Sequence, residues 1–461
     1  MNFFDAIVVF FEKILLPRWM APEWMHPVEV VGFYITLVIG LLFTVCYTYQ
    51  FLYVFLALVH PPKKYKDAPK TKRYAAIIAA RNEDTVIGNL LESIAVQDYH
   101  TVAPNMIDVF VVADNCTDNT EKVALSHGAK CYCRHDDKNR TKGFALQFLI
   151  ENIRKDYGIE HYDGYIVFDA DNLLSPDYIS RMNDAFDDGN KIICSYRNTK
   201  NFKTNWISAS YALHYLRTIR TEHRARSYLR MATRIQGTGF LVANEIIKDG
   251  WKYTSLTEDR ARSADAVVMG YDITYNNDAV FYDEQPTTLH SAMRQRIRWA
   301  KGNIQAFTES GGKLFLGIFK SKGIHLKLRN FDMLMTIFPR QLVTGFRRVI
   351  ILFTKAITFL LAADWLGIAP ALIFWFFTPF VKQWCYALYA LIFERKRIVK
   401  IPLYRIMWFV FMFPFFDVIG RIAMLIALFS HVEWKPIPHK EDIRLSDMQL
   451  DNTNKAPAKP I

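Results

Sequence analysis

Two aspartates near the middle of the chain, Asp169 and Asp171, have the type and spacing that bind a divalent cation. They follow residues 166–168, an apolar, β-branched run that predicts a buried strand. Side chains two residues apart on a strand share a face, so both carboxylates are expected at the strand's carboxyl end. Such oxygen ligands suit Mg²⁺ or Mn²⁺. The alternative is an Asx turn leading into a helix that starts near Ser175.

Three other polar clusters stand where a nucleotide site needs them. Residues 79–83 follow a predicted strand and place polar groups and exposed amides at a helix start. Asp114 ends the next predicted strand, where a carboxylate accepts hydrogen bonds from a base or ribose. Lys142 and Gly143 supply a cation and a close-approach glycine for a diphosphate. Each cluster is also ordinary turn composition. The sequence has no Gly-x-Gly-x-x-Gly and no Walker loop, which disfavours a dinucleotide or ATP site.

Two later clusters complete the candidate chemistry. Glu258 and Asp259 form a second acidic pair. Gln295, Arg298 and Trp299 are three and four residues apart, hence on one face of a predicted helix. An arginine can clamp a diphosphate leaving group, and an indole offers a flat surface for a sugar. The alternative is a cationic helix that covers a membrane surface, a role that would suit Arg294 and Arg296.

An α/β domain is predicted to position these residues. Strands are predicted over residues 74–79, 107–113, 165–168 and 191–195, with helices over 86–95 and from about 119. Strands that alternate with helices imply parallel strands in a doubly wound sheet. Ligands of such sheets bind at the carboxyl ends of the strands, where the aspartates fall.

The composition predicts membrane segments on both sides of that domain. The 461 residues are 51% hydrophobic with a net charge of +12, and their mean hydropathy is +0.03. Residues 28–59 contain one charged residue, Glu29, and are long enough to span a ~30 Å hydrocarbon core. Six basic residues then follow within 63–73, which predicts a cytoplasmic side. Because basic residues cluster beside apolar spans, the charge indicates membrane flanks rather than nucleic-acid binding.

The predicted domain organisation follows from this segregation. Residues 1–27 are expected to form an interfacial amphipathic helix rather than a cleaved signal peptide. A transmembrane helix covers 28–60, and the catalytic domain covers 70–312. Residues 331–430 are expected to contain an interfacial helix over 331–342 and three or four membrane spans. The last span, 403–430, is either one kinked helix or a re-entrant pair. Residues 431–461 form a polar tail, expected to be flexible beyond Asp442. Six scattered cysteines indicate reduced, unligated thiols.

Taken together, these residues resemble membrane-embedded family 2 glycosyltransferases, relatives of cellulose, hyaluronan and poly-N-acetylglucosamine synthases. The resemblance covers roughly residues 73–307, and residues 113–120 and 282–288 are similar to the bacterial exopolysaccharide subgroup. It depends on the order of seven motifs: Arg81-Asn82-Glu83, Asp114, Lys142-Gly143, Asp169-Ala170-Asp171, Gly237-Thr238-Gly239, Thr257-Glu258-Asp259 and Gln295-x-x-Arg298-Trp299.

The resemblance implies a GT-A-type, Rossmann-like nucleotide-sugar domain inserted between transmembrane helices, with the catalytic domain cytoplasmic at a bacterial plasma membrane. It also implies roles for individual residues. Asp171, with Asp169, would ligate Mg²⁺ or Mn²⁺, and Asp259 would be the general base. The nucleotide-sugar set would be Ala79, Arg81, Glu83, Asp114, Lys142 and Asp169. The set around the acceptor and diphosphate would be Gly237, Thr238, Gly239, Glu258, Gln295, Arg298 and Trp299.

The expected function is inverting β-glycosyl transfer from UDP-glucose or UDP-N-acetylglucosamine to a growing polysaccharide, processive and coupled to export. One displacement with one base inverts the anomeric centre. Expected partners are the UDP-sugar, a polysaccharide or glycolipid acceptor and the lipid bilayer, with no nucleic acid. The alternatives are transfer of one sugar to a lipid carrier or acceptor, and a transporter or scaffold with a nucleotide-sensing domain. No Phe-x-Val-Thr-like gating loop stands between residues 299 and 331.

Overall fold

A computed structural model of the chain describes residues 27–362, 365–437, 439 and 441–452. They fall into two compact units. One comprises the residues up to Leu52 together with Pro339–Cys385, and the other comprises Tyr53–Phe338 and the residues from Tyr386 on. The interfacial helix expected over residues 1–27 lies outside the described residues except for Pro27, which begins a helix. The other predicted domain boundaries stay predictions.

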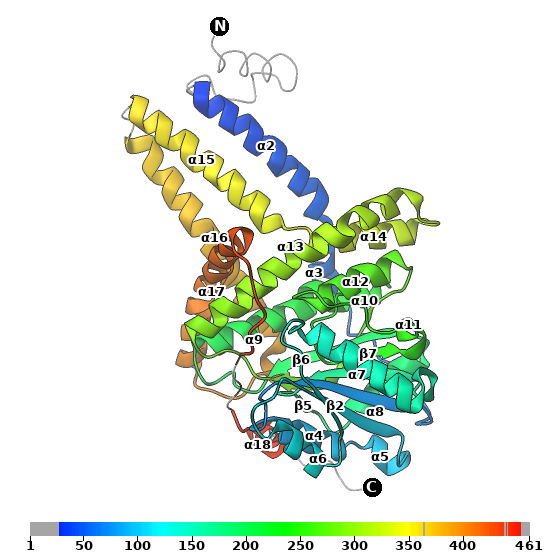
Figure 1. Ribbon diagram of the computed structural model, residues 1–461. Helices are drawn as coiled ribbons and strands as arrows, with labels where there is room; N and C mark the ends of the chain where they lie inside the picture. Colours follow the sequence, from blue (N-terminus) through cyan, green and yellow to red (C-terminus); the bar gives the residue numbers. More distant parts are fainter. Residues whose placement is uncertain (1–26, 363–364, 438, 440, 453–461) are drawn as a thin grey trace. The chain divides into compact units, whose positions relative to one another are not determined.

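The larger unit is built on one mixed sheet, whose eight strands in the described chain have the order β3-β2-β1-β4-β7-β6-β8-β5 (Figure 1). The strands are β1 (Tyr74–Ala80), β2 (Ile107–Asp114), β3 (Lys130–Arg134), β4 (Gly164–Asp169), β5 (Leu173–Leu174), β6 (Ile192–Thr199), β7 (Phe240–Ala243) and β8 (Thr274–Asp283). Four of them match the strands predicted from the sequence to within a few residues.

The predicted fold class is confirmed, but one part of the topology differs. β1 pairs in parallel with β2 and β4, and β2 pairs in parallel with β3. β7, by contrast, runs antiparallel between β4 and β6, and β5 runs antiparallel to β8. The expectation of a wholly parallel sheet is therefore wrong in this half. β7 is a four-residue strand, and its antiparallel pairing with both of its neighbours, β4 and β6, interrupts the parallel order.

Helices cover both faces of the sheet. Apolar residues of α4 (Ile87–Ala95), α6 (Thr120–Ser126) and α8 (Tyr178–Asp187) share a buried cluster with alternate residues of β1, such as Ala76 and Ile78. α7 (Lys142–Tyr157) covers β1–β3 from the opposite face, and its Leu146, Leu149 and Ile150 are fully buried. Figure 1 shows α7 on one side of the sheet and α4 and α6 on the other.

The other helices between the strands of this unit are α5 (Tyr99–Val102), η3 (Ile159–His161), α9 (Trp206–Thr218), η4 (Ile219–His223), α10 (Arg224–Tyr228), α11 (Asn244–Ile247) and α12 (Glu258–Val268). A further short helix, η5 (Arg395–Arg397), follows the long helix that ends at Glu394. The long helices are α2 (Pro27–Tyr47), α3 (Tyr49–Val59), α13 (Leu289–Lys320), α14 (Ile324–Ile337), α15 (Arg340–Ala362), α16 (Trp365–Glu394) and α17 (Leu403–Phe429).

Two stretches of the described chain are long and apolar enough to cross a membrane, judged by length and composition. They are Val30–Val59, which spans α2 and α3, and Leu403–Phe429. The second stretch is one continuous helix, α17, with Pro414 inside it. The sequence left a kinked helix and a re-entrant pair open, and the structure has the single helix.

The segment after α17 differs from its prediction. Residues beyond Asp442 were expected to be flexible, yet they form α18 (Leu445–Asn452). Met448 of this helix is buried with Leu173 and Val399 in a small apolar cluster. The polar composition of the tail concealed this, because only Met448 and Ile443 of the tail belong to that cluster.

Candidate functional site

Three neighbouring parallel strands end at one edge of the sheet, and the predicted polar residues meet there. The register aligns Ala80 of β1 with Ala113 of β2, and Ala79 with Asp169 of β4. Asp114 and Asp169 are therefore the last residues of β2 and β4, the two strands on either side of β1, and Arg81 directly follows β1. The sheet itself brings this part of the predicted site together, as expected for an α/β fold.

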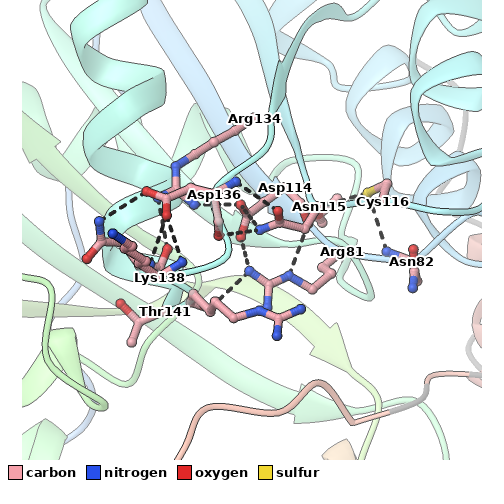
Figure 2. A network of polar contacts seen from close by, with 12 residues as sticks. Arg81, Asn82, Asp114, Asn115, Cys116, Arg134, Asp136, Lys138 and Thr141 are labelled. Atoms are coloured by element: carbon pink, nitrogen blue, oxygen red, sulfur yellow. Dashed lines mark hydrogen bonds and ion pairs between the residues drawn. The ribbon is translucent and has the colours of Figure 1, made fainter.

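Asp114 is the centre of a buried ion-pair network at this edge (Figure 2). Arg81 pairs with its Oδ2, and Arg134 Nη1 donates to its Oδ1 at 2.7 Å. Arg81 Nε also donates to the Asp114 carbonyl at 3.0 Å, and Arg134 Nη2 donates to Asp136 Oδ2 at 2.8 Å. Two guanidiniums are thus fixed on either side of one carboxylate that is 3% exposed.

Arg134 is a member of this network that sequence reasoning missed. It is the last residue of β3, which pairs in parallel with β2 so that Arg134 lies opposite Asp114. One feature of the sequence could have identified it: Arg134 is a basic residue that ends a short strand next to the predicted site. β3 escaped prediction because its residues, Lys-Cys-Tyr-Cys-Arg, do not alternate between apolar and polar.

Lys142, at the first residue of α7, lies at the centre of a second cluster. Its Nζ pairs with Asp169 and donates to the Gly237 carbonyl at 2.8 Å. Burial disfavours the charge of this ammonium, but Asp169 and Glu258 outweigh burial and raise the pKa of Lys142. A permanent cation therefore stands between the carboxyl end of β4 and the loop that carries Gly237.

Gly143 has a role that the sequence did not predict. A Cβ at this position would collide with the backbone of Tyr253 and Thr254. The residue must be a glycine because α7 packs directly on the loop that precedes α12. The close approach that requires a glycine here is therefore to the protein's own backbone, and the approach to a diphosphate stays a prediction.

Asp171 is held by main-chain and side-chain donors. The Glu284 amide donates to its Oδ2 at 2.8 Å, and Asn172 Nδ2 donates to its Oδ1 at 3.2 Å. Burial by itself raises the pKa of this carboxyl, yet neighbouring cations, first His439 and then Lys200, lower it. Asp171 is therefore ionised although it is only 4% exposed.

The two aspartates do not lie on one face of a strand, which corrects the sequence argument. β4 ends at Asp169, and residues 170 and 171 form a turn closed by the hydrogen bond from Asn172 N to the Asp169 carbonyl at 3.1 Å. Thr238 Oγ1 accepts from Asp169 N at 2.8 Å and itself donates to Asn172 Oδ1. These two hydrogen bonds tie the Gly237–Gly239 loop to the turn that carries Asp171.

The second acidic pair opens α12. Glu258 and Asp259 stand in its first turn, where the helix dipole favours negative charge. Burial raises the pKa of Glu258 to about 7, although Lys142 opposes the shift. A Cβ at Gly237 would lie 3.9 Å from Asp259 Oδ2, and this glycine has a φ of +83°. The structure thus places Asp259 beside the same loop that contacts Lys142 and Asp169.

The predicted Gln-x-x-Arg-Trp residues lie on α13 and face two environments. Gln295 and Arg298 line a cavity of about 260 Å³, together with the segment after α17. Trp299 instead packs edge-on against Tyr211 and Tyr215 of α9, at ring-centroid distances of 5.7 and 6.4 Å. Trp299 is therefore part of an aromatic wall, not part of the cavity lining.

The position of Arg296 contradicts the alternative in which this residue is a cation that covers a membrane surface. Its guanidinium lies 3.4 Å from the centroid of the Phe416 ring of α17, and a Cβ at Gly420 would clash with it. The side chain is enclosed between α13 and α17. Arg294 lies at the surface, where it contacts His290 at 2.8 Å.

Two further cations near Asp171 were not predicted. Arg197 of β6 pairs with Asp283, donates to the Gln236 carbonyl at 2.8 Å and lies 3.9 Å from the centroid of the Tyr215 ring. Lys200 is fully buried, and its Nζ has no hydrogen-bond partner among the described residues. Arg197 lies within β6 and Lys200 directly follows it, so both belong to the mixed half of the sheet that the sequence did not resolve.

A segment remote in the sequence also reaches this edge. We call residues 431–448, which follow α17, the C-terminal strap; its residues 438 and 440 are outside the described chain. His439 Nδ1 lies 3.0 Å from both carboxylate oxygens of Glu83, and its Nε2 lies 3.9 Å from Asp171 Oδ2. Burial favours the neutral ring, but Asp171 and Glu83 raise the pKa of His439 to about 10.

A divalent cation fits the side chains of this site only with help from a substrate. Among the described residues, no group of three or more His, Cys, Asp or Glu side chains is arranged to hold a metal ion. Mg²⁺ and Mn²⁺ sites of nucleotide enzymes commonly use one or two carboxylates and complete their coordination with phosphates and water. Asp169 at the end of β4 and Asp171 in the turn that follows match that donor set.

Comparisons with known proteins give relatives for this arrangement. A protein-family model described as glycosyltransferase like family 2 matches residues 69–302. The poly-β-1,6-N-acetyl-D-glucosamine synthase of Staphylococcus epidermidis is 24% identical over 270 residues, 57% of this chain and 61% of that protein. The probable glycosyltransferase YdaM of Bacillus subtilis is 24% identical over 262 residues, 52% of this chain and 58% of that protein. The chain thus spans about three fifths of these relatives.

A solved structure has a similar fold. The mannosyltransferase PcManGT from Pyrobaculum calidifontis, in complex with GDP-Man and Mn²⁺, superposes with a TM-score of 0.54 over 85% of this chain and 98% of that one. At 19% identity, this likeness establishes the fold alone. The family match covers half of the chain, and it spans every motif from Arg81 to Trp299. This chain belongs to the glycosyltransferase-like family 2.

Proposed function

We propose that this protein is an integral-membrane, metal-dependent inverting β-glycosyltransferase. It transfers a sugar from UDP-glucose or UDP-N-acetylglucosamine to a growing polysaccharide at the cytoplasmic face of a bacterial plasma membrane. One observation carries the proposal: Lys142 and the Gly237 loop join Asp169 and the turn of Asp171 to the acidic start of α12. A metal-binding pair and a candidate base thus surround one small-residue loop.

The network around Asp114 suits the nucleoside end of the donor. Both of its oxygens are paired with guanidiniums, which fixes the orientation of the carboxylate. Each carboxylate oxygen has two lone pairs, so Asp114 still has capacity to accept a hydrogen bond from a base N–H. Arg81, held on the same carboxylate, presents a flat cationic surface at the edge of the site.

The other end of the site suits the leaving diphosphate. A Mg²⁺ or Mn²⁺ ion held by Asp171 and Asp169 would offset the charge of the departing nucleoside diphosphate. Lys142 keeps Asp169 in place and adds a fixed positive charge beside it. Arg298 and Gln295 line the neighbouring cavity and are available to the phosphate oxygens.

Asp259 is the proposed base. It takes the proton of the acceptor hydroxyl as the acceptor oxygen bonds to the anomeric carbon and the bond from that carbon to the diphosphate oxygen breaks. One displacement inverts the configuration, so an α-linked donor gives a β-linked product. A positioned base of this kind contributes roughly 10²–10⁴-fold to the rate. Gly237 leaves room for the acceptor next to Asp259 Oδ2.

Membrane placement and a polymeric product are supported from outside the site. The apolar stretches 30–59 and 403–429 are long enough to span a bilayer, and basic residues follow the first within 63–73. The relative from Staphylococcus epidermidis is named as a synthase of poly-β-1,6-N-acetyl-D-glucosamine, which favours repeated transfer of N-acetylglucosamine.

Transfer of one sugar to a lipid acceptor is the second candidate. The cavity beside Gln295 favours it, because apolar residues such as Met293 and Ile297 line it together with Arg294 and Lys435. An apolar wall with cations at its rim suits a chain that ends in phosphate.

The test incubates the detergent-solubilised full chain with UDP-glucose, UDP-N-acetylglucosamine or GDP-mannose, each with Mn²⁺ or Mg²⁺, and sizes the products. The proposal expects a β-linked polymer from one of the two UDP-sugars. A product that carries a single sugar on a lipid supports the second candidate. Transfer from GDP-mannose alone, or from no donor, would contradict the proposal.

A further inference from the structure

One π-helical turn, η4, holds the segment that leads into the Gly237–Gly239 loop. We call residues 233–236 the lead-in segment. The last two residues of η4 are Glu222 and His223, and the side chains of both contact this segment. Arg234 Nε donates to Glu222 Oε2 at 2.9 Å. Turns of this kind are rare, and they occur frequently at functional sites.

His223 makes two hydrogen bonds to the lead-in segment, one with each ring nitrogen. Gln236 Nε2 donates to His223 Nε2 at 2.8 Å, and His223 Nδ1 bonds to Thr233 Oγ1. Burial lowers the pKa of His223 to about 3, so the ring is neutral, with one donor and one acceptor. Because an amide nitrogen only donates, Nε2 is the acceptor and Nδ1 carries the proton. The ring thus fixes the first and the last residue of the segment.

The lead-in segment is also fixed to the start of α12, where the proposed base stands. Ser263 Oγ accepts from Ile235 N at 2.9 Å and donates to the Asp259 carbonyl at 2.7 Å. The segment continues directly into Gly237, whose added Cβ would lie 3.9 Å from Asp259 Oδ2. The position of this glycine relative to the base therefore depends on how the segment is held.

η4 is itself anchored near the carboxyl ends of two long helices. Arg220 donates to the carbonyls of Ala57 in α3 and Phe393 in α16, at 3.2 Å in each case. It also pairs with Glu394, whose Oε2 accepts from the Tyr196 hydroxyl at 2.9 Å. These contacts restrain the turn on the side of Arg220, so its last two residues hold the lead-in segment from a fixed support.

We propose that Glu222 and His223 are positioning residues for the sugar acceptor, which hold Gly237 at the distance from Asp259 that the acceptor hydroxyl needs. This inference rests on the proposed function, which places the acceptor beside these two residues. A misplacement of roughly 1 Å far from the chemistry can slow a reaction about 10²-fold. In the described chain neither side chain bonds to Asp171, so donor binding is expected to be independent of both.

The first test compares transfer with hydrolysis. The detergent-solubilised full chain is supplied with Mn²⁺ and the UDP-sugar that wild type uses, and sugar is counted in the product and as free sugar released to water. His223→Ala is expected to slow transfer about tenfold or more and to slow hydrolysis far less, because water needs no acceptor site. Glu222→Ala, which releases Arg234, is expected to act in the same direction. The Kd for UDP–Mn²⁺ is expected to stay unchanged in both variants.

The matched control removes a buried hydrogen bond elsewhere. The Tyr99 hydroxyl in α5 donates to the Lys72 carbonyl at 2.8 Å. Tyr99→Phe deletes this bond, so it is expected to lower the melting temperature while leaving the ratio of hydrolysis to transfer as in wild type.

The second test separates the two hydrogen bonds of the ring. His223→Gln places an amide near the position of Nε2 and still offers an acceptor to Gln236. His223→Asn places an amide near the position of Nδ1 and still offers a donor to Thr233. Because Gln236 directly precedes Gly237, His223→Gln is expected to retain more transfer than His223→Asn.

The outcomes separate this proposal from the proposed function. If wild type transfers sugar but His223→Ala slows transfer and hydrolysis by the same factor, or leaves both unchanged, His223 does not position the acceptor. Weaker UDP–Mn²⁺ binding in proportion to the lost transfer would also overturn the proposal. If His223→Ala does not fold, equal transfer by His223→Gln and His223→Asn would overturn it instead. If wild type transfers no sugar from either UDP-sugar, the proposed function itself has failed.

Discussion

Gly302 of α13 packs directly on the side chain of Thr257, the residue that precedes Glu258 and Asp259. A Cβ at Gly302 would collide with Thr257 Oγ1, Cγ2 and Cβ. The helix that carries Gln295 and Arg298 therefore touches the start of the helix that carries the proposed base. This contact sets the distance between the proposed base and the Gln295 and Arg298 side of the site.

Replacing that glycine is expected to disturb both stability and transfer. Gly302→Ala forces α13 and α12 apart, at a cost of roughly 1–3 kcal/mol for an overpacked contact. Gly312→Ala, on the same helix with nothing within 4 Å of the added Cβ, is the control and is expected to stabilise by about 0.5–1 kcal/mol. Thermal unfolding in detergent, followed by tryptophan fluorescence, measures both. Equal effects of the two substitutions would rule out the close contact.

The network around Asp114 makes a second prediction. Arg134→Lys keeps the charge but loses the simultaneous contact with Asp114 and Asp136, because an ammonium is not a planar fork. Affinity for UDP–Mn²⁺ is expected to fall on the order of tenfold, the ~1.4 kcal/mol of a charge-assisted hydrogen bond. Lys138→Ala removes an exposed cation from the following loop and should leave affinity unchanged. Unaltered binding by Arg134→Lys would remove this network from the donor site.

Glu258 makes the unfolding stability depend on pH. Burial raises its pKa to about 7 in the folded chain, from 4.5 in the unfolded one. Between these values the folded state holds a proton that the unfolded state lacks, so the contribution of Glu258 to stability is lost as pH rises through 7. The amide of Glu258→Gln does not titrate, so this variant lacks that pH-dependent loss of stability.

The melting temperature of Glu258→Gln relative to wild type is therefore expected to rise between pH 5 and pH 8. Glu160→Gln, an exposed change, is expected to show a difference that does not vary with pH. A difference in melting temperature between Glu258→Gln and wild type that stays constant from pH 5 to pH 8 would show that Glu258 does not titrate in this range.

The two aspartates of the metal pair are expected to differ. Asp169 already forms an ion pair with Lys142, whereas Asp171 has no lysine or arginine within 4 Å in the described chain. Asp171→Asn should therefore raise the Mn²⁺ concentration for half-maximal transfer more than Asp169→Asn does. Chelation with EDTA should stop transfer by wild type, and added Mn²⁺ should restore it. The reverse order of the two variants would assign the main metal contact to Asp169.

The sequence predicted the parts of the fold that depend on local pattern. The strands at residues 74–79 and 107–113 are apolar runs that end in polar residues, and parallel pairing of neighbours then brings Arg81 and Asp114 together. The order of the motifs indicated the family, which the family match confirms. These inferences needed only residue type, spacing and the rule that ligands of α/β sheets bind at the carboxyl ends of the strands.

The remainder depended on contacts between distant residues. The sequence left Asp171 either on the strand or in a turn, and the outcome depends on Asn172 and Thr238, which hydrogen-bond across 66 residues. The packing of Gly143 on Tyr253 is likewise a contact between distant residues. His439 lies 356 residues from Glu83 in a polar tail, and its position became visible only with the chain folded.

The base assigned to Asp259 is the central claim, and the Asp259→Asn variant tests it most directly. The measurement is the initial rate of sugar transfer from the active UDP-sugar with saturating Mn²⁺, alongside the Kd for UDP–Mn²⁺ in the same preparation. The proposed mechanism predicts a rate at least ~10²-fold below wild type with a Kd within threefold. Transfer by Asp259→Asn at the wild-type rate would contradict it.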